Sequence, residues 1–320
     1  MFRKETLMAQ EWQSTALEID ETEDLIEVCY QNGWTDGLPV VPPTPERVER
    51  MLSGTDRDPD ELIAAVPPKW GRATVEKVAI NAVMAGCKPE YLPLLLTAVE
   101  AMTSEQFNLH GVQVTTSHVS PVLVVNGPIR KQLEINDGFN LFGQGWRANA
   151  TIGRTLRLIC TNIGGGLPGE LDRSAFGHAG KYTCCLAEKE EESPWDPLHV
   201  ERGFQADDST VTIFAGAGPQ TVNDHGNNTA EGILNTISDN IAAPGNTAGE
   251  TILVIGVEHA KTISEDGFNR ADIRQYIADT TKQYAAEDLM LMVAGGPAGR
   301  WTIVVPGWGS RSSRAITLAV

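Results

Sequence analysis

Apolar residues recur with the spacing of α-helices through the first third of the chain. Leu25 and Cys29 share one helical face before Gly33, and this spacing is typical of a helix that packs one side against a core. Thr44 and Pro45 indicate a helix start, because proline is favoured at the first helical position after an N-cap threonine. The pattern predicts helices within residues 25–33, 44–54, 75–86 and 89–102, and further along within 148–161 and 271–281.

The middle and end of the chain contain short β-rich runs instead. They lie at residues 122–125, 211–214, 252–255, 289–293 and 302–305. Strands that alternate with helices in this way indicate an α/β fold. The last two runs are separated by AGGPAGR, which predicts a hairpin, so we expect a mixed sheet with flanking helices.

An internal similarity predicts that two related α/β halves make up most of this fold. Residues 122–140 align with 252–269 when Asn126 is treated as an insertion, and each copy has an apolar strand, a glycine and then DGFN in matching register. We therefore expect a flexible arm over 1–20, a first half over 21–204 and a second half over 205–320. A ligand site is expected where the halves meet.

Charge and cysteine content exclude several classes of protein. The chain has 25 basic and 42 acidic side chains, a formal charge of −17, and so lacks the basic field that nucleic-acid or anionic-membrane binding needs. No apolar run approaches the roughly 20 residues of a membrane span, and no secretory signal is visible. Five cysteines at irregular spacing indicate reduced thiols, so we expect a cytoplasmic protein.

Reactive side chains concentrate in residues 177–204, a segment rich in glycine and proline that predicts irregular backbone beside a cleft. Cys185, next to Cys184, is the candidate nucleophile or redox thiol, because a nearby cation or imidazole can lower a thiol pKa. His178 or His199 is its candidate base, and Lys181, Glu201 and Arg202 are candidates for activating the thiol, orienting the imidazole or holding an anionic substrate. The alternative for Cys185 is a buried small hydrophobe.

Other candidate chemistry is more scattered. A transition metal held by His178, His199, His225 and His259 is an alternative, although CxxC and HExxH motifs are absent. Asp36, in WTDGLP, is either a turn residue or a carboxylate that projects into a site. The glycines at 164–166 and 295–296 match no Walker or Rossmann pattern, so we predict no nucleotide cofactor.

Several longer motifs carry a resemblance that covers about residues 20–320. WTDGLPVVPPTPERVERML, GHAGKY, SPWDPLHVERGF, NDHG and VVPGWGS resemble an uncharacterised bacterial family that is associated with the UGSC selenoprotein and thiol group. The resemblance implies thiol or selenol chemistry, with Cys185 as the matching position. This chain departs from that group because it has no Cys-Gly-Ser-Cys or selenocysteine equivalent.

Three functions therefore stay open at the level of sequence. The first is an enzyme that acts on a small molecule through a cysteine and histidine site, as a thiol-dependent oxidoreductase or a hydrolase or lyase. The second is a metal-dependent hydrolase or lyase with histidine and carboxylate ligands. The third is a non-catalytic binding subunit. The partners to consider are a small-molecule substrate, a second copy of the chain and a thiol or selenol redox protein.

Overall fold

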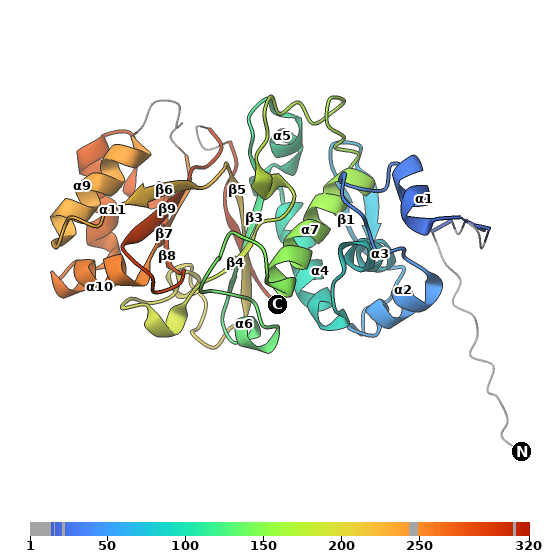
Figure 1. Cartoon of the computed structure of the whole chain (residues 1–320), viewed down its shortest axis with the longest axis horizontal. Helices are drawn as coiled ribbons and strands as arrows, with labels where there is room; N and C mark the ends of the chain where they lie inside the picture. The colour runs from blue at the N-terminus through green and yellow to red at the C-terminus, as the bar shows by residue number, and fades with distance from the viewer. Residues whose placement is uncertain (1–13, 16, 21–22, 243–248, 310–311) are drawn as a thin grey trace, which may run out of the picture.

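The chain folds into four layers, in which two β-sheets pack face to face and helices cover both outer faces (Figure 1). This computed structural model describes residues 14–15, 17–20, 23–242, 249–309 and 312–320. The α/β class predicted from the sequence is confirmed. Most of the predicted arm, residues 1–13 and 16, lies outside the described residues.

The α-helices include every helix that the sequence pattern predicts. They are α1 (Leu25–Gln31), α2 (Pro45–Leu52), α3 (Val75–Ala85), α4 (Leu92–Met102), α5 (Leu109–Val114), α6 (Ile129–Gln132), α7 (Arg147–Asn162), α8 (Leu198–Glu201), α9 (Ala230–Ile241), α10 (Val257–Glu265) and α11 (Arg270–Thr281). Local capping sets their ends. The Thr74 hydroxyl accepts a hydrogen bond from the Lys77 amide at the start of α3, and Gly86 ends this helix in the left-handed conformation.

Short 3₁₀ helices connect several of these elements: η1 (Pro89–Tyr91), η2 (Glu105–Phe107), η3 (Ala179–Lys181), η4 (Glu190–Glu192) and η5 (Ala286–Asp288). The strands are β1 (Leu62–Val66), β2 (Gly71–Thr74), β3 (Ser120–Asn126), β4 (Cys185–Ala187), β5 (Thr210–Gly216), β6 (Gln220–Asn223), β7 (Thr251–Ile255), β8 (Leu289–Val293), β9 (Trp301–Val305) and β10 (Ile316–Ala319). The β1–β2 pair forms a small separate ribbon.

The two large sheets have the same plan. The first has the order β10-β5-β3-β4 and the second β6-β9-β7-β8. In the first sheet, the central strand β3 pairs with β4 in parallel and with β5 antiparallel; in the second, β7 pairs with β8 in parallel and with β9 antiparallel. In each sheet, two α-helices connect the central strand to its parallel neighbour. The mixed sheet is therefore confirmed, whereas the duplication of the two halves stays a prediction.

Two connections differ from the expectation. β8 and β9 do not form a hairpin, because β9 pairs with β7 and β6 while β8 lies on the far side of β7. The chain also exchanges strands between the sheets: β6 follows β5 but joins the second sheet, and β10 follows β9 but joins the first. Strand β5 lies beyond residue 204 and still belongs to the first sheet.

Side-chain alternation along the strands divides the core into three parts. Val122 and Val124 of β3 pack between the sheets, whereas Leu123 and Val125 pack under the helices of the first sheet. The helix layer on this side includes α3, α4 and α7, and α9, α10 and α11 cover the second sheet (Figure 1). Because both faces of each sheet are covered, the inner strands β3 and β7 and the strand β8 are buried along their whole length.

Among the residues that the structure describes, none of the helices combines the length and the apolar composition that a bilayer span needs.

Candidate functional site

A pocket of about 550 Å³ gathers polar side chains from three distant parts of the chain. Residues 35–37 form one wall, the carboxyl-terminal part of α7 forms the second, and the loop over 166–182 forms the third. We call it the Lys181 pocket. Its volume lies within the range of small-molecule sites, roughly 300–1,000 Å³.

Asp36 is held in the wall of the Lys181 pocket by an arginine of α7. Arg154 donates two hydrogen bonds to it, from Nε to Oδ2 at 2.8 Å and from Nη2 to Oδ1 at 2.7 Å. Burial raises the pKa of the Asp36 carboxyl, but the hydrogen bonds and charge of Arg154 outweigh burial and leave that pKa lowered. Asp36 is therefore an ionised group that anchors the WTDG turn to α7.

Lys181 and Asp172 form an ion pair in the loop wall. The Lys181 Nζ lies 2.8 Å and 3.0 Å from the two carboxylate oxygens of Asp172, and the Lys181 side chain is 17% exposed. Burial lowers the pKa of the Lys181 ammonium, and the Asp172 carboxylate only partly offsets that effect. At a given pH, a larger fraction of Lys181 is therefore the neutral amine than in an ordinary lysine.

Arg157 is the unpaired cation of this site. Its Nε donates to the backbone carbonyl of Lys181 at 2.8 Å, and its Nη1 donates to Gln113 Oε1 at 3.3 Å. It makes no ion pair with a carboxylate in the described part of the chain. A half-buried guanidinium without a counterion, beside an ammonium, favours an anionic ligand.

His178 fixes the loop that carries Lys181. Its Nδ1 accepts a hydrogen bond from the Gly180 amide at 3.1 Å, so in the neutral ring the proton is on Nε2. Burial lowers the pKa of His178 to about 4, and electrostatic interactions with His118 and Lys181 act in the same direction. His178 is therefore neutral at pH 7, and its buried Nε2 has no hydrogen-bond partner among the residues that the structure describes.

Together these groups can hold an organic anion and move a proton. Arg157 supplies charge-assisted hydrogen bonds. Lys181 can donate a proton as an ammonium or accept one as an amine. Its pKa is lowered toward neutral pH, which favours the exchange of a proton between the two forms. Phe176 and Tyr182, both exposed, line the rim of the pocket.

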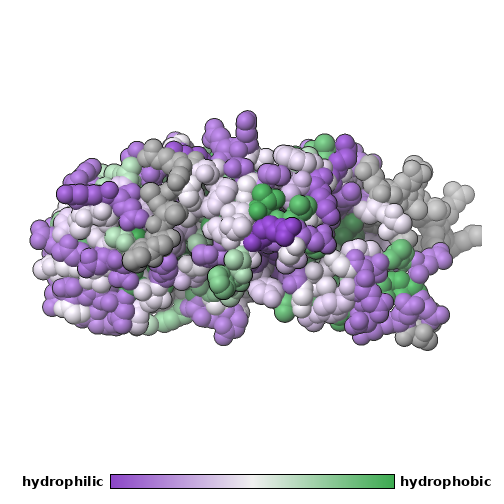
Figure 2. Space-filling model, turned by 90° about the horizontal axis from the view of Figure 1, so that it is seen from above, coloured by the Kyte–Doolittle hydropathy of each residue, from purple (hydrophilic) through white to green (hydrophobic). Residues whose placement is uncertain are grey.

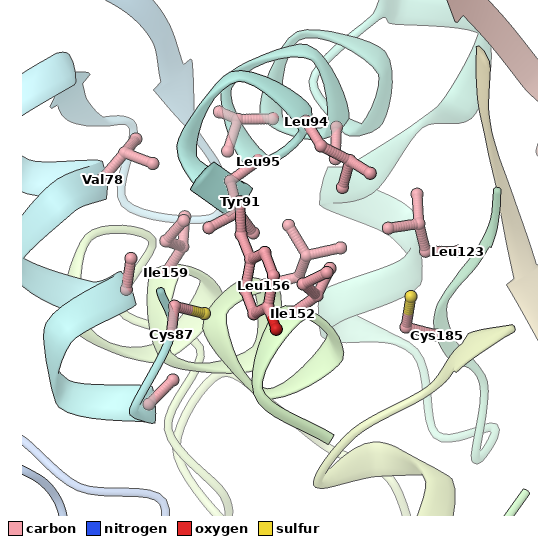
Figure 3. Close-up of a cluster of buried hydrophobic side chains, with 14 of the residues drawn as sticks. Val78, Cys87, Tyr91, Leu94, Leu95, Leu123, Ile152, Leu156, Ile159 and Cys185 are labelled. Atoms are coloured by element: carbon pink, nitrogen blue, oxygen red, sulfur yellow. The ribbon is translucent and has the colours of Figure 1, made fainter. Parts of the chain in front are cut away.

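Cys185 lies away from this chemistry. It is a residue of β4 that is 3% exposed and belongs to the core under α7, where Figure 3 shows it among buried hydrophobic side chains such as Leu123 and Ile152. Burial raises the pKa of the Cys185 thiol far above its ordinary value, and burial raises that of Cys184 to about 12. The structure does not bring the Cys185 sulfur together with His178 or Lys181 at the pocket.

The remaining predicted side chains of 177–204 do not line the Lys181 pocket. His199 is fully buried, with no hydrogen-bond partner on either ring nitrogen. Glu201 pairs with Arg270 and Arg274. Arg202 donates to the Thr317 hydroxyl and to the Ala315 carbonyl, and so does not pair with Glu201.

The histidines proposed as metal ligands make other contacts. His225 contacts Trp301 edge to face, and the ring nitrogens of His259 are paired with the Thr302 hydroxyl and the Asp224 carbonyl oxygen. No group of three or more histidine, cysteine, aspartate or glutamate side chains in the described ranges is arranged to hold a metal ion.

Arg157 and Asp172 are site residues that the sequence predictions do not include. A signal for Arg157 was present, because Arg154 and Arg157 are three residues apart on a predicted helix and therefore lie on one face. Asp172 had no comparable local signal, since its partner Lys181 lies nine residues away in irregular backbone.

Comparisons of the chain with protein-family models, with curated proteins and with solved structures each returned no match.

Proposed function

We propose that this chain is an enzyme for a small organic anion, with Arg157 as the anion-binding group and Lys181 as the group that transfers a proton. The observation that carries the proposal is the half-buried Arg157 guanidinium, which has no carboxylate partner among the described residues and lies beside the Lys181–Asp172 pair. The proposal keeps the small-molecule enzyme expected from the sequence, and moves its chemistry from the Cys185 thiol to the Lys181 amine.

Each side chain has one role in the proposed reaction. Arg157 holds a carboxylate or phosphate of the substrate, which fixes the substrate's position relative to Lys181. The Lys181 ammonium gives a proton to the substrate and becomes an amine, or the amine takes a proton and becomes an ammonium. Asp172 orients Nζ, while His178 is a positioning residue for the loop.

Reductive trapping with glyoxylate, a small anionic aldehyde, tests both roles. The Lys181 Nζ attacks the aldehyde carbon, water leaves, and cyanoborohydride supplies the hydride that reduces the imine. At pH 7 we expect peptide mass spectrometry to find Lys181 labelled at least tenfold faster than the exposed Lys261, because its lowered pKa provides more neutral amine.

The Arg157→Gln variant separates anion binding from amine reactivity. We expect it to slow glyoxylate labelling of Lys181 about tenfold, which corresponds to about 1.4 kcal/mol, and to leave labelling by neutral formaldehyde within about twofold. Lys181 no more reactive than Lys261 toward either aldehyde would overturn the proton-transfer role. An equal effect of the variant on both aldehydes would overturn the anion-binding role.

A further inference from the structure

A second cavity, of about 620 Å³, lies on the other side of the 34–45 segment. Its walls come from four residues of the arm (Ser14, Thr15, Leu17 and Ile19), from helices α1, α2 and α3, and from the carboxyl-terminal end of α7. We call it the α1–α3 cavity. Trp34 lines this cavity while the next three residues line the Lys181 pocket, so one short segment separates the two spaces.

Most of the wall of the α1–α3 cavity is apolar. Its side chains include Val28, Trp34, Val48, Ile80 and Met84. Figure 2 shows hydrophobic side chains reaching the surface at the right-hand end of the molecule, which is the end that α1 and α2 form in Figure 1. An open apolar hollow of this size is a feature that small-molecule sites share.

Polar groups without partners line the same cavity. Arg72 of β2 and Lys77 in the first turn of α3 contribute to its wall, and neither makes an ion pair with any residue that the structure describes. Asn162 donates from Nδ2 to Asn81 Oδ1 at 2.8 Å, but its own Oδ1 is buried without a partner. Two unpaired cations at an apolar hollow, in a chain of net charge −17, select an anion that also has a hydrophobic body.

From this combination we infer that the α1–α3 cavity binds an amphipathic organic carboxylate of medium length. The apolar body lies against Val28, Ile80 and Met84, and the carboxylate is held by Lys77 and Arg72. The inference does not depend on the function proposed for Lys181, because the two cavities share no lining residue.

Calorimetric titration with three ten-carbon probes tests this inference on the full chain. Decanoate, decanol and decyltrimethylammonium have similar apolar bodies and differ in head-group charge. We expect decanoate to bind with a stoichiometry of one, decanol to bind at least tenfold more weakly, and the cation to show no binding, because a cation would face Lys77 and Arg72.

Variants locate the bound molecule. Lys77→Met and Arg72→Met should each weaken decanoate binding about five- to tenfold and leave decanol binding unchanged, while Lys261→Met, a change at an exposed lysine of α10, should leave both unchanged. Met84→Trp fills the cavity and should abolish both. Because that variant can fail to fold, photolabelling of the unmodified chain with a diazirine-bearing decanoate is the second measurement, and the label is expected on peptides that contain Val28, Trp34 or Met84.

Three results would overturn the inference. Decanoate that does not bind would exclude the ligand class. Decanoate and decanol of equal affinity, each unaffected by Lys77→Met, would show that the carboxylate is not recognised. Sedimentation that finds a dimer, together with photolabel outside the cavity, would assign this face to a second copy of the chain.

Discussion

Helices α7 and α11 occupy matching places in the two sheets, since each lies between a central strand and its parallel neighbour, yet their arginines have different surroundings. On α11, Arg270 bonds Glu188 at 2.7 Å and Glu201 at 2.9 Å, and Arg274 bonds Glu201 at 2.5 Å. On α7, Arg154 pairs with Asp36, whereas Arg157 has no carboxylate partner in the described ranges. Both arginines of α11 are therefore neutralised by carboxylates, as is Arg154 of α7, whereas Arg157 is not.

This contrast distinguishes buried charges that are neutralised by one another from a charge that can still contact a ligand. Glu188 is fully buried and accepts hydrogen bonds from Asn126, from Arg270 and from the Leu198 amide. A buried ion whose bonding positions are filled in this way leaves nothing for a ligand. Arg157 keeps donor capacity at a pocket, and this difference is the basis for proposing a site beside α7.

The largest expected effect comes from breaking the buried ion pair between Arg270 and Glu188. Arg270→Met leaves Glu188 as a buried carboxylate without its main counterion, because the Arg270 side chain is 4% and that of Glu188 0% exposed. We expect the free energy of unfolding to fall by about 3–5 kcal/mol, measured by urea denaturation at pH 7.

Arg157→Met is the matched control on α7. It removes an arginine from the equivalent helix without stranding a carboxylate, and should cost no more than about 1 kcal/mol. Similar losses for the two variants would contradict the distinction between the helices.

A smaller effect on the free energy of unfolding is expected at Cys185. A reactive Cys185 thiol and a buried Cys185 side chain predict opposite results. Cys185→Ala removes a buried sulfur from the core under α7, and should lower the free energy of unfolding by roughly 1–2 kcal/mol without changing glyoxylate trapping at Lys181. Because burial raises its thiol pKa, Cys185 in the folded chain should resist iodoacetamide at pH 7 and react only after unfolding. Stoichiometric labelling of Cys185 in the native protein would restore the thiol hypothesis.

The smallest effect concerns pH. The pKa of His178 is about 4 in the folded chain, against an ordinary value of 6.5, so between these values the unfolded chain binds a proton that the folded chain does not. Stability contributed by the neutral imidazole is therefore lost as pH falls from about 6.5 toward 4.

His178→Gln should show a shallower decline in the free energy of unfolding between pH 7.5 and pH 5 than the unmodified chain, measured by urea denaturation. His110→Gln keeps the His178 imidazole and should retain the decline that this group causes. Parallel declines for His178→Gln and the unmodified chain would contradict the assignment.

Local patterns predicted much of the fold, because helices and buried strands are encoded by nearby residues. Each predicted apolar run lies within one of β3, β5, β7, β8 and β9, and the Thr44–Pro45 start of α2 was visible in two residues. Sheet order was not predictable in this way. The pairing of β9 with β7 is set by contacts between residues about 50 positions apart.

The site was predicted in part. Residues 177–204 were expected to be irregular backbone beside a cleft, but they include η3, β4, η4 and α8, and β4 is buried in the first sheet. The partners of the segment's side chains, such as Arg157 and Arg270, come from distant helices. The orientation of Cys185 depended on strand register, since neighbouring residues of a strand point to opposite faces. A shift of one residue would have placed Cys184 in the core under α7 instead.

The exchange of strands between the two sheets also governs the order in which the protein can be completed. The first sheet obtains its edge strand β10 from residues 316–319, although its other strands are made by residue 216. During synthesis, the β5 edge therefore stays unpaired while about a hundred further residues are added. The first sheet cannot be excised as one continuous segment without the second, because β10 follows β6–β9 in the chain, and a cut between β6 and β7 would remove one edge strand from each sheet.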